Sequence, residues 1–321
     1  MSEVVVRASI AAGIAFAVAM LIGPITIKNL RKLRAGQVVR DDGPQSHLKK
    51  SGTPSMGGVI IIVSLLLGSA AATPGYSMLP WALFITTGCG LVGMLDDYIS
   101  IVSHRSLGLR ARQKILFQLI FGLILGAWAY SNPNIGSEII IPFSDGRMID
   151  LGIWYIPFTM LVLVASANAV NLSDGLDGLA SGTMAIASFA YVAVASSVGH
   201  GEAGAFAGAV GGACLGFIWW NAYPAAIFMG DTGSLALGAA LASMAVLTRT
   251  ELLLLVIGGV YVAEAMSDVI QVAYFKLTGK RVFRMAPIHH HFELKGVPEP
   301  KIVVRFWIVA AFLAALGFAA L

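Results

Sequence analysis

The chain has 321 residues, of which 57% are apolar and only 12% are charged. Soluble domains are about 45–50% apolar and about 25% charged, so this composition excludes an ordinary soluble enzyme and a disordered chain. Two cysteines cannot build a disulfide scaffold, and a net charge of +4 does not by itself indicate a nucleic-acid partner. The composition predicts an all-α polytopic membrane protein, with residues 1–321 forming a single domain.

Long apolar runs predict about ten transmembrane helices, because a bilayer core about 30 Å thick requires roughly 20 mostly apolar residues per crossing. The first run continues through Gly23 and Pro24 without a cleavage site and a following soluble segment, so we expect a retained anchor and not a signal peptide. The ten runs lie at 8–27, 56–73, 79–95, 114–130, 153–170, 179–198, 204–221, 233–248, 252–273 and 303–320.

The basic residues are divided unequally between the two sides of such a bundle. Ten crossings place both termini on one side, and the loops on the other side hold 18 of the 21 Lys and Arg. By the positive-inside rule these loops face the cytoplasm, and both termini are extracytoplasmic. The five loops are 28–55, 96–114, 171–178, 222–232 and 274–305.

One outer segment predicts a small β-hairpin near 138–150, because a β-branched run and a second short apolar run flank an Asp145-Gly146 turn. We expect it to have a structural role.

Glycines at 204, 208, 212 and 216 share one helical face, a spacing that allows close helix approach. Packing within the chain is the simpler interpretation, and a homodimer contact is the alternative.

Two adjacent carboxylates, Asp96 and Asp97, end an apolar run. Acids near membrane depth are costly, and these two repel one another at the negative end of a helix dipole. A divalent cation, a nearby lysine or a shared proton would relieve the repulsion. The alternative is a solvated helix end.

A second polar segment, 168–178, joins the fifth and sixth predicted spans and carries two amides and two acids without any basic residue. Its polar members are Asn168, Asn171, Asp174 and Asp177. Such residues also cap helices and form turns, so a plain connector is the alternative. A third segment, 228–234, contains Asp231, which either caps the next helix or holds a metal with the other acids.

Three consecutive histidines, His289, His290 and His291, lie in a basic loop. On an extended segment they point in different directions and cannot all bind one metal, whereas they suit phosphate as donors and cations. An incidental polar run is the alternative. In the ninth predicted span, Glu264, Asp268 and Gln271 lie on one helical stripe, which favours either a structural hydrogen-bond network or a catalytic role.

By the charge distribution, the acid pair, both polar segments and the histidines all lie on the cytoplasmic side. Acids, histidines and lysines that meet at one membrane surface predict a site for phosphate and a divalent metal. The chemistry that fits best is phosphoryl transfer from a nucleotide conjugate to a lipid headgroup, with Mg2+.

Five stretches, distributed over nearly the whole chain, resemble those of the phospho-N-acetylmuramoyl-pentapeptide transferase family, a branch of the polyprenyl-phosphate N-acetylhexosamine phosphate transferases. The uninterrupted triple histidine marks this branch, whereas the aspartate motifs are general to the superfamily. The stretches are 51–58, 93–98, 168–178, 228–234 and 285–293.

This resemblance implies transfer of phospho-N-acetylmuramoyl-pentapeptide from its UDP conjugate to undecaprenyl phosphate, with release of UMP, at the bacterial inner membrane. It further implies that Asp231 is the Mg2+ ligand, that Asp96 and Asp97 form an essential pair and that His289 is critical. The remaining implied site residues are Lys50, Asn171, Asp174 and Phe228 near uridine, Lys114 and Gln271 near phosphate, His290 and His291 near the sugar phosphate or nucleotide, and Asn168.

Two positions depart from the family pattern. Ser100 stands where a lysine is common, so Arg105, Arg110 or Arg112 would have to replace its charge, and Asp268 occupies a position expected to be apolar. Both a direct attack by the lipid phosphate and a route through an aspartyl phosphate fit these residues, and we favour direct attack.

Three other functions remain open. A transferase of N-acetylglucosamine phosphate is the nearest, and the triple histidine argues against it. An ion or solute transporter would require polar residues through the full membrane depth. An intramembrane aspartyl protease would require Asp97 and Asp231 within hydrogen-bond reach and no Mg2+ dependence.

Overall fold

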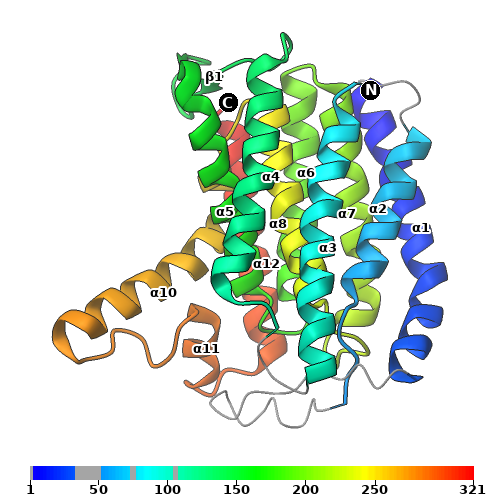
Figure 1. Cartoon of the computed structure of the whole chain (residues 1–321), viewed down its shortest axis with the longest axis vertical. Helices are drawn as coiled ribbons and strands as arrows, with labels where there is room; N and C mark the ends of the chain where they lie inside the picture. Colours follow the sequence, from blue (N-terminus) through cyan, green and yellow to red (C-terminus); the bar gives the residue numbers. More distant parts are fainter. Residues whose placement is uncertain (1–2, 33–51, 73–76, 104–107) are drawn as a thin grey trace.

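The computed structural model describes residues 3–32, 52–72, 77–103 and 108–321. Within these ranges the chain is a bundle of long helices, with one small sheet at one end (Figure 1). The long helices are α1 (Glu3–Lys32), α2 (Gly58–Ala72), α3 (Leu79–Ser103), α4 (Ala111–Ser131), α5 (Tyr155–Ser173), α6 (Leu179–Ser197), α7 (Gly201–Asn221), α8 (Gly230–Leu247), α10 (Gly259–Thr278) and α12 (Glu299–Ala319). The short elements are β1 (Glu138–Ile140), β2 (Met148–Asp150), the 3-10 turn η2 (Gly152–Trp154), α9 (Leu254–Ile257) and α11 (Ile288–Glu293).

In this part of the chain, eight helices are long and apolar enough to cross a membrane, which agrees with a polytopic membrane protein. They are α1, α3, α4, α5 together with η2, α6, α7, α8 and α12. Helix α2 is apolar but has only 15 residues. The interior of the bundle is α8, which is almost entirely buried among its neighbours.

The ninth predicted span, 252–273, differs from the expected single helix. The chain is interrupted at Gly258, between α9 and α10, and α10 extends away from the bundle (Figure 1). The physical reason is the pair Gly258-Gly259, because glycine has a low helix propensity. The break directs Glu264 and the rest of α10 toward α11.

Both chain ends and the hairpin lie at one end of the bundle (Figure 1). At that end β1 and β2 pair in antiparallel register, with Ile139 opposite Ile149, which confirms the predicted hairpin. The hairpin also holds the end of α12, because Phe143 donates its backbone N–H to the carbonyl oxygen of Ala320. The loops that carry the predicted site lie at the opposite end.

The glycine stripe of α7 packs against α1. A Cβ at Gly208 would lie 2.3 Å from the carbonyl oxygen of Ala8, and one at Gly212 would lie 2.1 Å from that of Ala12. The stripe therefore serves close contact between two helices of the same chain, as the simpler interpretation predicted, and α1 occupies the face that a homodimer contact would have used.

Replacement of Gly212 by Ala should lower the thermal stability of the purified protein, because the methyl group forces apart two backbones that touch. Overpacking of this kind costs about 1–3 kcal/mol. Gly211→Ala is the matched control, since its new methyl group would meet only the ring of Phe189, which is partly exposed and can move. Equal melting temperatures of the two variants would contradict this packing.

A buried acid lies at the hairpin end, in the turn after α8. Glu251 is 2% exposed, and its Oε1 accepts a hydrogen bond of 2.6 Å from the Tyr155 hydroxyl at the start of α5. Burial raises the pKa of Glu251 to about 7, although the Tyr155 hydrogen bond and the nearby Arg249 oppose the rise.

Because the folded state holds this proton more tightly than the unfolded chain, stability should fall as pH rises from about 4.5 to about 7. Glu251→Gln keeps an acceptor for Tyr155 and removes the charge. We therefore expect the variant to melt at a higher temperature than wild type at about pH 8, and at a similar temperature at about pH 5. The measurement is thermal unfolding in detergent at both pH values, and parallel curves for the two proteins would contradict the assignment.

Candidate active site

Two helices bring three acids to the end of the bundle away from the hairpin. Asp96 and Asp97 lie on α3, and Asp231 lies in the first turn of α8. The helices can approach because Gly93 has no side chain: a Cβ there would lie 2.0 Å from the carbonyl oxygen of Asp231. One oxygen of each carboxylate lies within 4.8 Å of the others. These three acids, together with Lys114, are called the acidic centre below.

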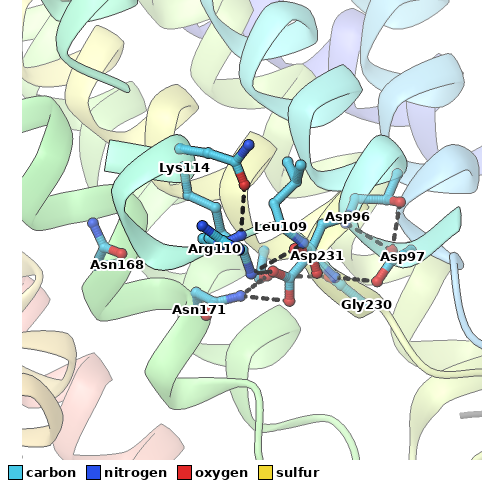
Figure 2. A network of polar contacts seen from close by, with 12 residues as sticks. Asp96, Asp97, Leu109, Arg110, Lys114, Asn168, Asn171, Gly230 and Asp231 are labelled. Carbon is cyan, nitrogen blue, oxygen red and sulfur yellow. Dashed lines mark hydrogen bonds and ion pairs between the residues drawn. The ribbon is translucent and has the colours of Figure 1, made fainter. Parts of the chain in front are cut away.

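Asp97 is engaged by the beginning of α8. Its Oδ1 accepts the backbone N–H of Asp231 at 3.1 Å, and its Oδ2 accepts the Thr232 N–H at 3.0 Å and the Thr232 hydroxyl at 2.6 Å (Figure 2). The first N–H groups of a helix have no partner within the helix and carry partial positive charge. Asp97 therefore caps α8 from another helix, a role that the sequence analysis had assigned to Asp231 as an alternative.

The Asp231 carboxylate points away from the backbone of α8 and toward two other helices (Figure 2). Lys114 Nζ on α4 lies 2.5 Å from Asp231 Oδ2 and 3.0 Å from Asp96 Oδ1. Asn171 Nδ2 on α5 donates to Asp231 Oδ1 at 2.9 Å and to Ser234 Oγ at 2.8 Å. One lysine thus joins Asp96 to Asp231. The amide of Asn171 binds the other oxygen of Asp231 and so fixes the orientation of that carboxylate.

Asp96 retains a free acceptor. Its Oδ1 accepts from Lys114 and from the backbone N–H of Leu109 at 2.7 Å, whereas no donor among the described residues reaches its Oδ2. Asp96 as a residue is only 6% exposed, and its two bonds hold the carboxylate in place. Asp96 can therefore accept a proton or hold a cation.

The donor set fits a hard divalent cation. Three carboxylates share one lysine, so the acidic centre keeps an excess of negative charge, and carboxylate oxygens are the ligands that Mg2+ prefers. Asp231 and Asp96 are the candidate ligands, because Asp231 is bonded only by side chains, which can move aside, and Asp96 keeps one open oxygen, whereas both oxygens of Asp97 are held by backbone N–H groups of α8.

Asn168 is placed one turn from Asn171, and its Nδ2 donates to Gln118 Oε1 at 2.7 Å and to the Val164 carbonyl at 2.7 Å. Among the described contacts it does not touch the acidic centre (Figure 2). Gln118, which the sequence analysis missed, is 2% exposed and lies one turn beyond Lys114 on α4. The hydrogen bond between Asn168 and Gln118 thus joins α5 to α4 beside the acidic centre.

The loop after α5 links the acidic centre to the histidines. Burial raises the pKa of Asp174 well above its ordinary value, and the carboxylates of Asp231 and Asp97 raise it further, which places Asp174 within electrostatic reach of the acids. The next residue, Gly175, contacts His289: a Cβ at Gly175 would lie 2.2 Å from His289 Nε2.

The histidines lie on α11, a six-residue helix, so the expected extended segment is wrong. Their side chains do diverge as predicted. His289 Nδ1 lies 3.0 Å from Glu264 Oε2, His290 Nδ1 lies 2.7 Å from Glu293 Oε2, and His291 Nδ1 accepts the Arg284 N–H at 3.1 Å. Burial, followed by Lys295 and Arg284, lowers the pKa of His291.

Gln271 on α10 holds the loop before α11. Its Oε1 accepts the N–H of Val282 and of Phe283, and its Nε2 donates to the Phe283 carbonyl at 3.0 Å. Phe228 is half-buried, and its backbone pairs with Pro54 and Gly57, so the segment after Gly52 lies beside the start of α8. Lys50 and Arg105 lie outside the described residues.

Three residues that bind the predicted side chains were not predicted from the sequence. Thr232 donates to Asp97, Ser234 accepts from Asn171, and Gln118 accepts from Asn168. Short polar residues of this kind occur throughout apolar helices, and only the three-dimensional contacts distinguish them. Asp268, the unexplained departure, is half-buried one turn after Glu264 on α10.

The structure is a bundle of apolar helices with an acidic centre at one end, and comparison with known proteins identifies the class as a transferase. Residues 79–249 match the profile of glycosyl transferase family 4, and residues 50–62 match signature 1 of phospho-N-acetylmuramoyl-pentapeptide-transferase.

Full-length relatives define the family more closely. A phospho-N-acetylmuramoyl-pentapeptide-transferase of Clostridioides difficile is 50% identical over 302 residues, with 94% of each chain covered. Proteins with the same name are 47% identical in Desulforudis audaxviator, with 97% of each chain covered, and 45% identical in Pelobacter propionicus, with 96% of this chain and 90% of the relative covered. The chain belongs to the phospho-N-acetylmuramoyl-pentapeptide-transferase family.

Asp97→Asn should lower the free energy of unfolding by about 1–3 kcal/mol, because the amide group turns a donor toward the unpaired N–H groups of α8. Both changes remove one of three mutually repelling carboxylates, but Asp231→Asn should cost less stability, since it leaves the first N–H groups of α8 bonded to Asp97. Thermal unfolding of both variants in detergent checks this order, and a larger loss for Asp231→Asn would show that Asp97 is not the cap.

Proposed function

We propose that this protein transfers phospho-N-acetylmuramoyl-pentapeptide from its UDP conjugate to undecaprenyl phosphate, releases UMP and so makes the first lipid intermediate of peptidoglycan. The observation that carries the proposal is the acidic centre itself, in which Asp96, Lys114 and Asp231 meet at the end of a bundle of apolar helices. An acceptor anchored in the membrane and a water-soluble donor can meet only at such a surface. The name of relatives 45–50% identical over almost the whole chain supports it.

In this reaction an oxygen of the lipid phosphate attacks the β-phosphorus of the donor. A new P–O bond forms, the bond from that phosphorus to the bridging oxygen breaks, and UMP leaves with the bridging oxygen. Charge neutralisation and alignment of two anions account for most of the catalysis in phosphoryl transfer, so no protein nucleophile is required. Lys114 offsets negative charge on the phosphates, and Asp96 Oδ2 is the open oxygen through which this residue binds the cation proposed below.

Mg2+ is the proposed cofactor, with Asp231 and Asp96 as its protein ligands. When bound, a divalent cation withdraws charge from phosphate oxygens and lets two anions approach. Asn171 holds the Asp231 carboxylate in a fixed orientation, and Asp97 fixes the helix that carries it. The chain thus preorganises a carboxylate at the reacting phosphates.

The remaining predicted site residues are proposed to contact the two substrates. We propose that Asn171, Asp174 and Phe228, with Lys50, lie around the uridine, where the Phe228 ring can stack on uracil. Lys114 and Gln271 belong to the phosphate region, and Asn168 supports it from behind. His289, His290 and His291 lie near the sugar phosphate.

The proposed location is the bacterial inner membrane, with the acidic centre on the cytoplasmic side. If α2 and the interrupted α9–α10 segment are added to the eight candidate spans, the chain crosses ten times and both termini are extracytoplasmic. Most of the basic residues then lie in the cytoplasm, as the positive-inside rule requires. The proposed partners are the two substrates and membrane lipid, without nucleic acid. The predicted homodimer would need a surface other than the glycine stripe of α7, which α1 covers.

The direct test is UMP release from UDP-N-acetylmuramoyl-pentapeptide and undecaprenyl phosphate in detergent, with and without Mg2+. Wild type should require Mg2+, and Asp231→Asn should lose at least about 100-fold in turnover, since metal and carboxylate act on the reacting phosphates. Magnesium-independent turnover, or an active Asp231→Asn variant, would overturn the metal assignment.

Asp145→Asn is the matched control, because Asp145 is exposed in the hairpin turn and asparagine tolerates its positive φ of 54°. Its activity should equal that of wild type. UDP-N-acetylglucosamine as donor should release no UMP, and efficient release would favour the related transferase instead.

A further inference from the structure

Glu264 and His289 form a fully buried pair between α10 and α11. The side chains of both residues are 0% exposed, and His289 Nδ1 lies 3.0 Å from Glu264 Oε2. Removing a carboxylate from water is costly unless its partner is well placed. The close contact therefore needs a reason beyond chance packing.

Each member of the pair keeps one open atom. Although both are buried, His289 Nε2 and Glu264 Oε1 have no hydrogen-bond partner in the described part of the chain. Buried polar atoms are normally satisfied, and an open one costs about 1–3 kcal/mol. In His289 the ring is thus held at Nδ1 alone, and Nε2 is the ring nitrogen that no described protein group binds.

The two ring nitrogens of His289 face different parts of the molecule. Nδ1 faces Glu264, whereas Nε2 contacts Gly175, where the absence of a side chain makes room for the ring. Gly175 directly follows Asp174, which lies within electrostatic reach of Asp231 and Asp97. Nε2 therefore faces the loop after α5, whose residue Asp174 is coupled electrostatically to the acids, while Nδ1 faces Glu264 on α10.

We propose that Glu264 is a positioning residue for His289. Its Oε2 accepts the Nδ1–H, which fixes the orientation of the ring and one tautomer, and Nε2 is left without a protein partner, so that it can bond a phosphate or sugar once the loop at Gly175 gives access to it. A carboxylate behind a functional imidazole commonly does this in other sites, where its loss costs about 10–100-fold in activity. This inference rests on the proposed function, because it assigns the side of His289 that substrate meets.

The break between α9 and α10 is what makes this arrangement possible. A straight continuation of the helix through Gly258 would carry Glu264 along the bundle, whereas α10 packs against α5 and reaches α11 (Figure 1). The interruption thus brings a carboxylate from a predicted span behind a histidine of the loop.

The test compares Glu264→Gln, His289→Ala and the double variant in the UMP-release assay. Glu264→Gln should lower kcat about 10–100-fold with little change in the KM for the UDP conjugate. Since Glu264 acts through His289, the double variant should be no less active than His289→Ala alone. Losses that multiply in the double variant, or a Glu264→Gln variant as active as wild type, would overturn the proposal.

Glu251→Gln is the matched control, because Glu251 is an equally buried acid that is bonded to Tyr155 at the opposite end of the bundle. It should retain wild-type kcat, whereas equal loss in both variants would point to a general effect of removing a buried acid and contradict the proposal.

Nitrogen-15 spectra of histidine-labelled protein give a readout that does not depend on activity. The His289 signals, assigned by their absence in His289→Ala, should show a proton on Nδ1 in wild type and a changed tautomer in Glu264→Gln. Unchanged signals would refute the positioning role even in an active enzyme. If wild type releases no UMP, but the spectra of wild type and Glu264→Gln differ as expected, the proposed function is wrong, while the contact between Glu264 and His289 is confirmed.

Discussion

The structure depends on keeping three carboxylates together at one end of an apolar bundle. Like charges at this separation repel, and the low-dielectric surroundings make the repulsion stronger. The bundle offsets it with three different partners: the N–H groups that begin α8 bind Asp97, the ammonium of Lys114 joins Asp96 to Asp231, and the amide of Asn171 holds Asp231. Each partner comes from a different helix, so the acids lock α3, α4, α5 and α8 in one arrangement.

Asp96 and Asp97 are adjacent and look equivalent in the sequence, but they have different partners in the structure. Asp97 accepts three hydrogen bonds from the start of α8, whereas Asp96 has an oxygen without a donor among the described residues. The aspartate that opens α8, Asp231, is released from capping and can face the other acids. We therefore propose that Asp96 and Asp231 carry the chemistry of the centre and that Asp97 fixes its geometry.

Much of the fold could be predicted from the sequence, because membrane helices and hairpins have local signals. Apolar runs indicated the spans, the Asp145-Gly146 turn indicated the hairpin, and the glycine spacing of α7 indicated close packing. The interruption at Gly258 was not predicted, since hydropathy does not register a break within an apolar run. The acids and histidines were recognised as chemical groups, but their partners Thr232, Ser234 and Gln118 depend on contacts between distant segments and have no local signal.

The most direct test of the central claim is to locate a divalent ion in the protein. Anomalous X-ray scattering from crystals grown with Mn2+, a common substitute for Mg2+, would show the ion's position relative to the three acids. We expect one peak in contact with the carboxylates of Asp231 and Asp96, with Asp97 still bonded to the first turn of α8. A peak held by Asp97, or a peak elsewhere with none at the acidic centre, would contradict the account.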